Sequence, residues 1–137
     1  MDKATQTKKL GELEKILEQQ TALHKMLLMA LGRKHQAIRQ SKTAEMEACC
    51  RQENQHLQAI GEAEKQRQTL VAELTLAIDP QAVAPMTLLQ LAERLPEPWR
   101  SRLLMRRLEL RELVEKTRTQ SGIARKAAES LLRHVQG

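Results

Sequence analysis

Apolar residues recur at alternating steps of three and four positions through the first 78 residues, in two stretches separated by one polar break. This heptad spacing places an apolar face along a helix that packs against a neighbouring helix. It predicts two long helices, over residues 3–40 and 43–78, folded into an elongated antiparallel hairpin. The apolar positions of the first stretch are Leu10, Leu13, Leu17, Leu27, Leu31 and Ile38, and those of the second include Met46, Leu57, Ile60, Leu70, Leu74 and Ile78.

The polar break spans residues 40–43 and reads Gln-Ser-Lys-Thr. We expect Thr43 to cap the second helix, because its hydroxyl can accept a hydrogen bond from a backbone N–H of the first turn. Glu45 and Glu47 follow, and carboxylates stabilise the positive end of a helix dipole. The chain should therefore reverse direction within these few residues.

Prolines divide the chain after the hairpin. Pro80 and Pro85 end the second long helix, because proline has no N–H with which to continue it. Thr87 and Gln90 then have the spacing of a capping box, in which each side chain satisfies a backbone N–H of the other. A short helix over residues 87–95 is predicted.

A last long helix is predicted over residues 98–135. Pro98 stands in its first turn, where the missing N–H is not needed. The apolar stripe weakens before Gly122, and a glycine inside a helix costs about 1 kcal/mol relative to alanine. We expect a hinge near Gly122, with residues 98–114 packed on the hairpin and residues 123–135 partly free to contact a partner.

Composition favours helices throughout. The chain is 41% hydrophobic, yet it has no Phe, no Tyr and one Trp, so that Leu, Met and Ala must fill the core. These side chains suit packing between helices, whereas a sheet prefers β-branched and aromatic residues. We predict an all-α fold, a single bundle-like or coiled-coil-like domain of residues 1–137 in which the short helix and the long C-terminal helix pack on the hairpin.

Positive charge is concentrated at the C-terminal end. The formal net charge is +6, and residues 97–137 contain ten basic and five acidic side chains. A basic helix attracts acidic protein surfaces, nucleic acid or anionic membranes, and charge alone does not choose among them.

No residue pattern points to catalysis, a metal or a cofactor. The chain has no Gly-rich phosphate loop and no nucleophile motif. His24 and His56 would supply only two ligands, fewer than a metal site needs. The neighbours Cys49 and Cys50 lack a Cys-x-x-Cys spacing, so we expect reduced thiols. The longest apolar run, residues 26–31, is too short to cross a membrane, and residues 1–5 do not lead into the apolar core typical of a secretory signal. We expect a soluble cytoplasmic protein that is not an enzyme.

The hairpin has the helix lengths and leucine spacing of a known family. Its first arm reads Leu23-x3-Leu27-Leu28-x2-Leu31 and leads to Ala37-Ile38, and its second arm carries Leu57-x2-Ile60 and Glu64-x2-Arg67-x2-Leu70. With the short helix and the long last helix that follow, the chain resembles the FlgN-like flagellar type III export chaperones. Family members commonly place asparagines around the stretch aligned with residues 118–122, where this chain reads Arg-Thr-Gln-Ser-Gly.

The resemblance implies a cytoplasmic chaperone that binds the helical terminal region of flagellar hook-associated proteins, prevents their premature assembly and delivers them to the export apparatus. An apolar stripe can mask the amphipathic helix of such a subunit. We expect this stripe on the last helix, with Arg111 and Arg118 attracting acidic segments of the partner. The same stripe could instead pack on the chain's own hairpin. The apolar candidates are Leu110, Leu113, Val114, Ala124, Leu131 and Val135.

Two other functions stay open. The last helix could bind nucleic acid, although aromatic stacking platforms are nearly absent and glutamates interrupt its basic residues. Alternatively, the chain could be a structural coiled coil that forms homodimers through the same stripe. The arginines that motivate the first alternative are Arg100, Arg102, Arg106, Arg107 and Arg111.

Overall fold

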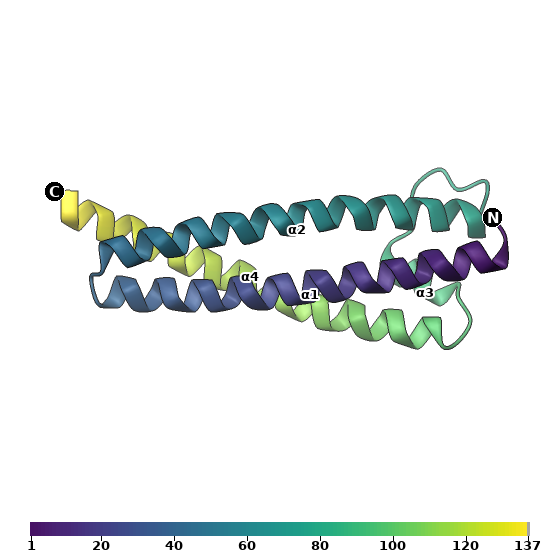
Figure 1. Cartoon of the computed structure of the whole chain (residues 1–137), viewed down its shortest axis with the longest axis horizontal. Helices are drawn as coiled ribbons and strands as arrows, with labels where there is room; N and C mark the ends of the chain where they lie inside the picture. The colour runs from purple at the N-terminus through teal and green to yellow at the C-terminus, as the bar shows by residue number, and fades with distance from the viewer. Residues whose placement is uncertain (137) are drawn as a thin grey trace. The chain divides into compact units, whose positions relative to one another are not determined.

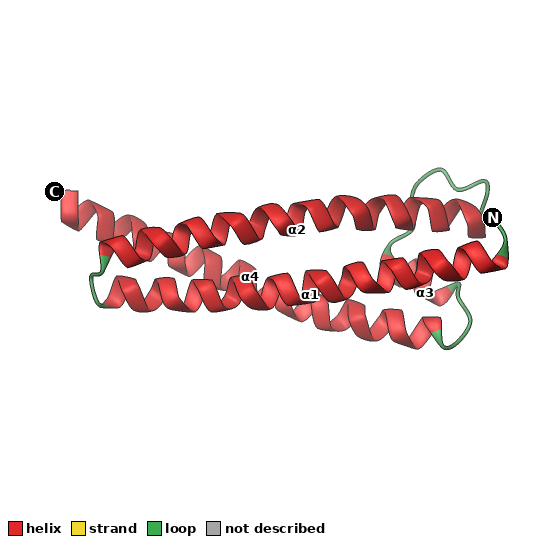
Figure 2. Ribbon diagram, in the orientation of Figure 1, coloured by secondary structure: helices red, strands yellow, loops and turns green. Residues whose placement is uncertain are grey.

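In a computed structural model, residues 1–136 fold into four α-helices (Figure 1). The structure describes the backbone of these residues and their side chains, except the side chains at positions 124, 125, 127–129 and 132–136 of the last helix. Within this described part there is no strand (Figure 2), so the predicted all-α fold is confirmed. Each helix limit lies within two residues of its predicted position. The helices are α1 (Lys3–Arg39), α2 (Thr43–Ile78), α3 (Leu88–Glu93) and α4 (Trp99–Gln136).

The contacts of the chain divide it into two compact units. Unit 1 comprises Met1–Thr21 and Gly61–Arg111, and unit 2 comprises Ala22–Ile60 and Glu112–Gly137. Helices α1, α2 and α4 each contribute one segment to each unit. The single-domain organisation stays a prediction, and the two units are described in turn.

Unit 1 contains the larger apolar core. The heptad positions of both hairpin arms meet there and are joined by α3 and by Leu103 of α4, which is fully buried. Burying one leucine side chain stabilises a fold by about 1.5–3 kcal/mol relative to leaving it exposed. This part of α4 therefore packs on the hairpin, as predicted. The buried core residues are Leu10, Leu13, Leu17, Leu70, Val71, Leu74, Leu91, Ala92, Leu95 and Leu103.

Helix α3 begins with the predicted capping box. The Thr87 hydroxyl accepts a hydrogen bond from the Gln90 N–H at 3.1 Å, and the Gln90 side chain accepts one from the Thr87 N–H at 3.0 Å. Just before the helix, the Met86 N–H donates to the hydroxyl of Thr75 at 3.0 Å. Thr75 is fully buried in α2, so this bond ties the connecting loop to the core.

The hairpin turn lies in unit 2 and ends α1 with a Schellman motif. The Ser41 N–H donates to the Ile38 carbonyl at 3.0 Å, and the Lys42 N–H donates to the Ala37 carbonyl at 2.8 Å. Ser41 has φ 55°, in the left-handed region that such a motif requires. One residue in this conformation reverses the chain direction.

Helix α2 begins at residue 43, as predicted, but its cap lies one residue earlier than expected. The Lys42 carbonyl accepts the first helical hydrogen bond, from the Met46 N–H at 3.0 Å. Lys42 therefore takes the cap position, and Thr43 is the first residue inside the helix. The prediction that Thr43 is the cap was wrong, because the left-handed Ser41 completes the turn sooner than the polar sequence indicates.

The apolar core of unit 2 is small and its helix contacts are more polar. The side chains of Lys34 and Glu53 form an ion pair at 3.1 Å across the hairpin and are only 7% and 14% exposed. Such buried polar pairs at heptad positions commonly fix the register of two helices. The apolar residues form two clusters, one of Leu27, Leu31 and Ile60 and the other of Ala37, Ile38, Met46 and Leu131.

Helix α4 passes through Gly122 without a break, so the backbone shows no interruption where we expected a hinge. Leu131 lies beyond this glycine and packs against Ala37 and Met46, so at this position the last helix is not free. The helix therefore tolerates the unfavourable helix propensity of Gly122. None of the described helices has an apolar stretch long enough to cross a membrane.

Candidate partner-binding surface

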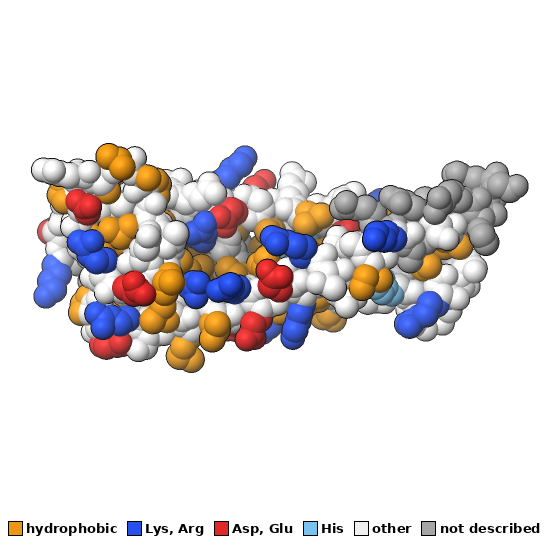
Figure 3. Space-filling view, turned by 180° about the vertical axis from the view of Figure 1, so that it is seen from behind, with side chains coloured by type: hydrophobic (Ala, Val, Ile, Leu, Met, Phe, Trp, Pro, Cys, Tyr) orange, Lys and Arg blue, Asp and Glu red, His pale blue; other side chains and the backbone are white. Residues whose placement is uncertain are grey.

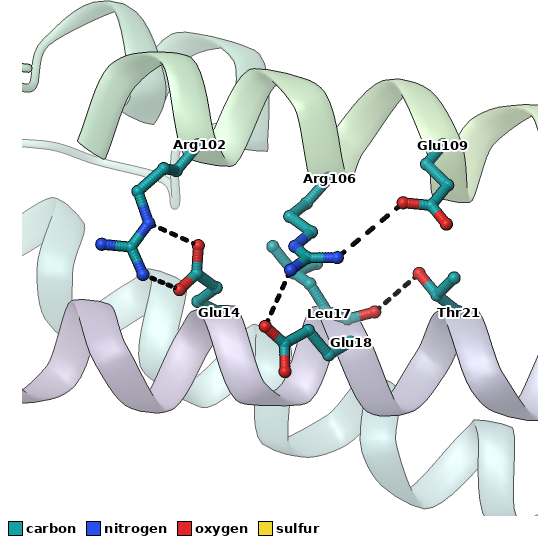
Figure 4. A network of polar contacts seen from close by, with 7 residues as sticks. All are labelled: Glu14, Leu17, Glu18, Thr21, Arg102, Arg106 and Glu109. Carbon is teal, nitrogen blue, oxygen red and sulfur yellow. Dashed lines mark hydrogen bonds and ion pairs between the residues drawn. The ribbon is translucent and has the colours of Figure 1, made fainter. Parts of the chain in front are cut away.

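Two arginine–glutamate pairs attach α4 to α1 in unit 1 (Figure 4). The Arg102 Nε–H donates to Glu14 Oε2 at 2.9 Å, and a second N–H of the same guanidinium donates to the other carboxylate oxygen. Arg106 pairs with Glu18 at 2.9 Å. The partners are four residues apart on each helix, which is about one turn. Both pairs therefore fix the rotation of α4 about its own axis.

Other arginine contacts at this end of α4 are also internal. The Arg102 guanidinium lies 4.8 Å from the centroid of the Trp99 ring, a cation–π contact. Arg100 donates to the carbonyl of Leu95 at 3.2 Å and to that of Glu93 at 3.4 Å. These carbonyls lie at the end of α3 and just after it, where helical partners are lacking. Arg100 and Arg102 thus stabilise the fold.

Three further arginines of α4 make no such contacts. Arg107, Arg111 and Arg118 have no hydrogen bond or ion pair with any residue that the structure describes. Arg111 and Arg118 are exposed, whereas Arg107 is half-buried. A guanidinium without an internal carboxylate is available to an acidic partner. The predicted partner role of Arg111 and Arg118 stays a prediction.

The predicted apolar candidates do not all face solvent. Leu110 packs against the core of unit 1, and Leu131 packs against a cluster of unit 2. Leu113 and Val114 are half-buried. The side chains of Ala124 and Val135 lie outside the described part. At Leu110 and Leu131 the stripe therefore packs on the chain's own hairpin, which was the alternative left open by the sequence.

The structure exposes apolar side chains on α4 that the sequence analysis did not select. Met105 is 72% exposed, Leu108 is 56% exposed and Ile123 is 50% exposed. The first two are three residues apart and so are neighbours on the helix surface. They were missed because the heptad pattern marks the residues that face the hairpin. The three-residue spacing of Met105 and Leu108, on the face opposite the heptad stripe, was the sequence signal that could have indicated them.

A buried polar contact connects α1 and α4 in unit 2. The Thr117 hydroxyl donates to the Val114 carbonyl at 2.9 Å and lies 3.3 Å from Nδ1 of His24. Since a hydroxyl has only one proton to donate, His24 acts as the donor to Thr117. Burial lowers the pKa of His24, because desolvation disfavours the charged imidazolium. His24 is thus held as a neutral structural residue.

The described residues contain no group of three or more His, Cys, Asp or Glu side chains that could hold a metal ion. Both Cys49 and Cys50 are free thiols, and burial raises the pKa of the Cys49 thiol. A higher pKa leaves less of the reactive thiolate at neutral pH. Cys49 therefore lacks the environment of a catalytic nucleophile.

A comparison with protein families identifies the family of this chain. The model of the family described as FlgN protein matches residues 1–137, the whole chain. The chain belongs to the FlgN family. This confirms the resemblance seen in the hairpin and gives the protein the general role of a flagellar export chaperone. A search of curated proteins finds no match, and neither does a search of solved structures.

FlgN proteins are chaperones of flagellar type III export, so the surface that matters is one that holds another polypeptide. In unit 1 of this FlgN protein, Met105 and Leu108 of α4 are exposed, and Arg107 and Arg111 have no described internal carboxylate. These four residues are candidates for contact with such a polypeptide.

Proposed function

We propose that this FlgN protein is a cytoplasmic chaperone that binds the helical terminal region of flagellar hook-associated proteins and delivers them to the type III export apparatus. An unpaired amphipathic helix on a subunit exposes an apolar face and tends to self-associate. A chaperone that covers this face keeps the subunit from assembling before export.

The second half of α4 provides the observation that carries this proposal. Val114 is half-buried, and Arg118, four residues later on the same helical face, is exposed without an internal carboxylate. Apolar and cationic groups side by side suit an amphipathic helix with acidic residues. Of the other predicted residues, Leu110 and Leu131 pack on the hairpin. The proposed binding site on α4 keeps Arg111, Leu113, Ala124 and Val135.

Co-purification with the hook-associated proteins of the same organism tests the proposal. Wild type should capture one or more of them, and Val114→Asp and Arg118→Glu should each reduce capture while far-ultraviolet circular dichroism stays unchanged. Arg51→Glu is the matched control, because Arg51 is exposed on α2 and has no described partner. Failure of wild type to capture any hook-associated protein would overturn the proposal.

Nucleic-acid binding has less support. Glutamates neutralise Arg102 and Arg106, two of the five arginines that motivated it. On the described part of the face in Figure 3, basic, acidic and hydrophobic side chains are interspersed. Phosphate binding favours a continuous basic stripe. Strong and steeply salt-dependent retention on an oligonucleotide would restore this alternative.

Homodimer formation through α4 is the remaining alternative. It would use the same apolar residues, so cargo and a second copy of the chain would compete for one surface. Light scattering at several protein concentrations separates the two, because a homodimer dissociates on dilution.

A further inference from the structure

Unit 1 contains two classes of arginine on α4. Arg102 and Arg106 are neutralised by carboxylates of α1, whereas Arg107 and Arg111 have no hydrogen bond or ion pair within the described part of the chain. Arg107 and Arg111 are four residues apart, so they are neighbours on the helix surface. Like charges in this arrangement destabilise an isolated helix. Repulsion between the two guanidiniums therefore does not favour folding.

The surface beside these arginines is apolar. Leu108 directly follows Arg107 and lies three residues before Arg111, and its side chain is 56% exposed. Met105 lies three residues before Leu108 and is 72% exposed. At 100° per residue, Arg107, Leu108 and Arg111 share one side of the helix and Met105 borders it. Together these four residues form the Arg107–Arg111 surface.

The chemistry of this surface selects its partner. Two guanidiniums about one turn apart match two carboxylates at the same spacing on a second helix, and Arg–carboxylate hydrogen bonds are among the strongest in proteins. Leu108 and Met105, which lie to one side of the two arginines, match an apolar ridge beside those carboxylates. Glu112 and Glu115 follow Arg111 along the chain, so the basic segment is short. A short basic segment fits a helical peptide better than a nucleic-acid backbone.

We infer that the Arg107–Arg111 surface binds an acidic amphipathic helix, through charge-assisted hydrogen bonds from Arg107 and Arg111 to two carboxylates and through apolar contact with Leu108 and Met105. The inference rests on the proposed function, because the helix is assigned to the terminal region of the exported cargo. It adds the chemical class of the segment bound and two arginine–carboxylate pairs that orient it.

The test measures binding of the full chain to the purified terminal helical segment of a hook-associated protein by isothermal titration calorimetry. Arg107→Glu with Arg111→Glu should weaken binding by about tenfold to a hundredfold, since two charge-assisted hydrogen bonds become repulsive contacts. The matched control is Arg51→Glu with Lys65→Glu. It changes the net charge equally at two exposed positions of α2 that have no described side-chain partner, and it should bind like wild type.

The apolar part is tested separately with a control of equal exposure. Leu108→Ala should weaken binding several-fold because it removes buried apolar area from the complex. Leu76→Ala should leave binding unchanged. Leu76 lies on α2 and is 54% exposed, so its exposed fraction is close to that of Leu108. Equal effects of the two substitutions would place the apolar contact elsewhere and contradict this part of the surface.

Charge exchange gives the decisive result. If the acidic residues of the cargo segment face the two arginines, changing a pair of them to arginine should restore binding to the Arg107→Glu, Arg111→Glu variant and weaken binding to wild type. Cargo binding that is unchanged in this variant would overturn the inference and leave the proposed function intact. Absence of cargo binding by wild type would overturn both. Oligonucleotide binding by wild type that is lost in the variant, with cargo binding unchanged, would assign the surface to nucleic acid.

Discussion

Arg102 of α4 and Glu14 of α1, which are 88 positions apart in the sequence, form a two-point ion pair in unit 1 (Figure 4). The Glu14 side chain is only 10% exposed, whereas that of Arg102 is 49% exposed. The carboxylate has therefore lost most of its contact with water and depends on one guanidinium to replace it. The pair links the N-terminal part of the hairpin to the last helix.

Arg102→Ala should destabilise the protein by about 1–2 kcal/mol, because it leaves a largely buried carboxylate without its charged partner. Urea unfolding followed by circular dichroism measures this difference. Arg107→Ala is the matched control on the same helix and should change the free energy of unfolding by no more than about 0.5 kcal/mol. Equal effects of the two substitutions would show that the Glu14 contact does not stabilise the fold.

The features that the sequence predicted well are those that depend on residues close together in the chain. Leu10, Leu13 and Leu17 repeat at heptad spacing, and all three are buried, because periodicity alone decides which face of a helix is apolar. Thr87 and Gln90 are three residues apart, and the capping box they form depends only on that spacing. Helix limits and the all-α fold follow from such local signals.

The features that sequence missed depend on distant residues or on one backbone angle. Nothing near Arg102 or Arg107 indicates that Glu14 neutralises only the first, since that follows from how α4 is rotated against α1. The cap of α2 was misplaced because the left-handed conformation of Ser41 has no sequence signal as clear as a glycine.

The free energy of unfolding should depend on His24 below about neutral pH. Burial lowers the pKa of His24 in the folded state from its ordinary value of 6.5. The unfolded state therefore takes up the proton first as the pH falls below 6.5, and folding stability decreases until the folded-state pKa is reached. Above 6.5 the residue is neutral in both states and contributes no pH dependence.

His24→Gln tests this dependence, since glutamine is neutral at every pH and can still donate a hydrogen bond to Thr117. Urea unfolding at pH about 7.5 and about 5.5 should show a larger loss of stability in wild type than in the variant. The other three histidines are present in both proteins, so the comparison isolates His24. A variant that loses as much stability as wild type would contradict the assignment of a lowered pKa.

Thr75→Val should destabilise unit 1 by about 1–2 kcal/mol. The Thr75 hydroxyl accepts the Met86 N–H and donates to the Val71 carbonyl, and valine has the same shape but can do neither. Hydrogen exchange should also show a less protected amide at Met86. Thr69→Val is the control, because the Thr69 hydroxyl donates only to Lys65 on an exposed face. Unchanged protection at Met86 would exclude a role for this bond in holding the loop.

Substitutions at the buried pair of Lys34 and Glu53 can distinguish an effect on stability from an effect on the register of the hairpin. Glu53→Ala should cost about 3 kcal/mol, because it leaves the Lys34 ammonium buried without a partner. Replacing both residues, as Lys34→Met with Glu53→Leu, removes the two desolvated charges together and should restore wild-type stability or exceed it in urea unfolding. If the pair sets the register of the hairpin, the double variant should be stable yet give a broadened or doubled amide spectrum, since an apolar seam permits shifted alignments of α1 against α2. A single sharp spectrum from a stable double variant would mean that the surrounding heptad residues fix the register alone.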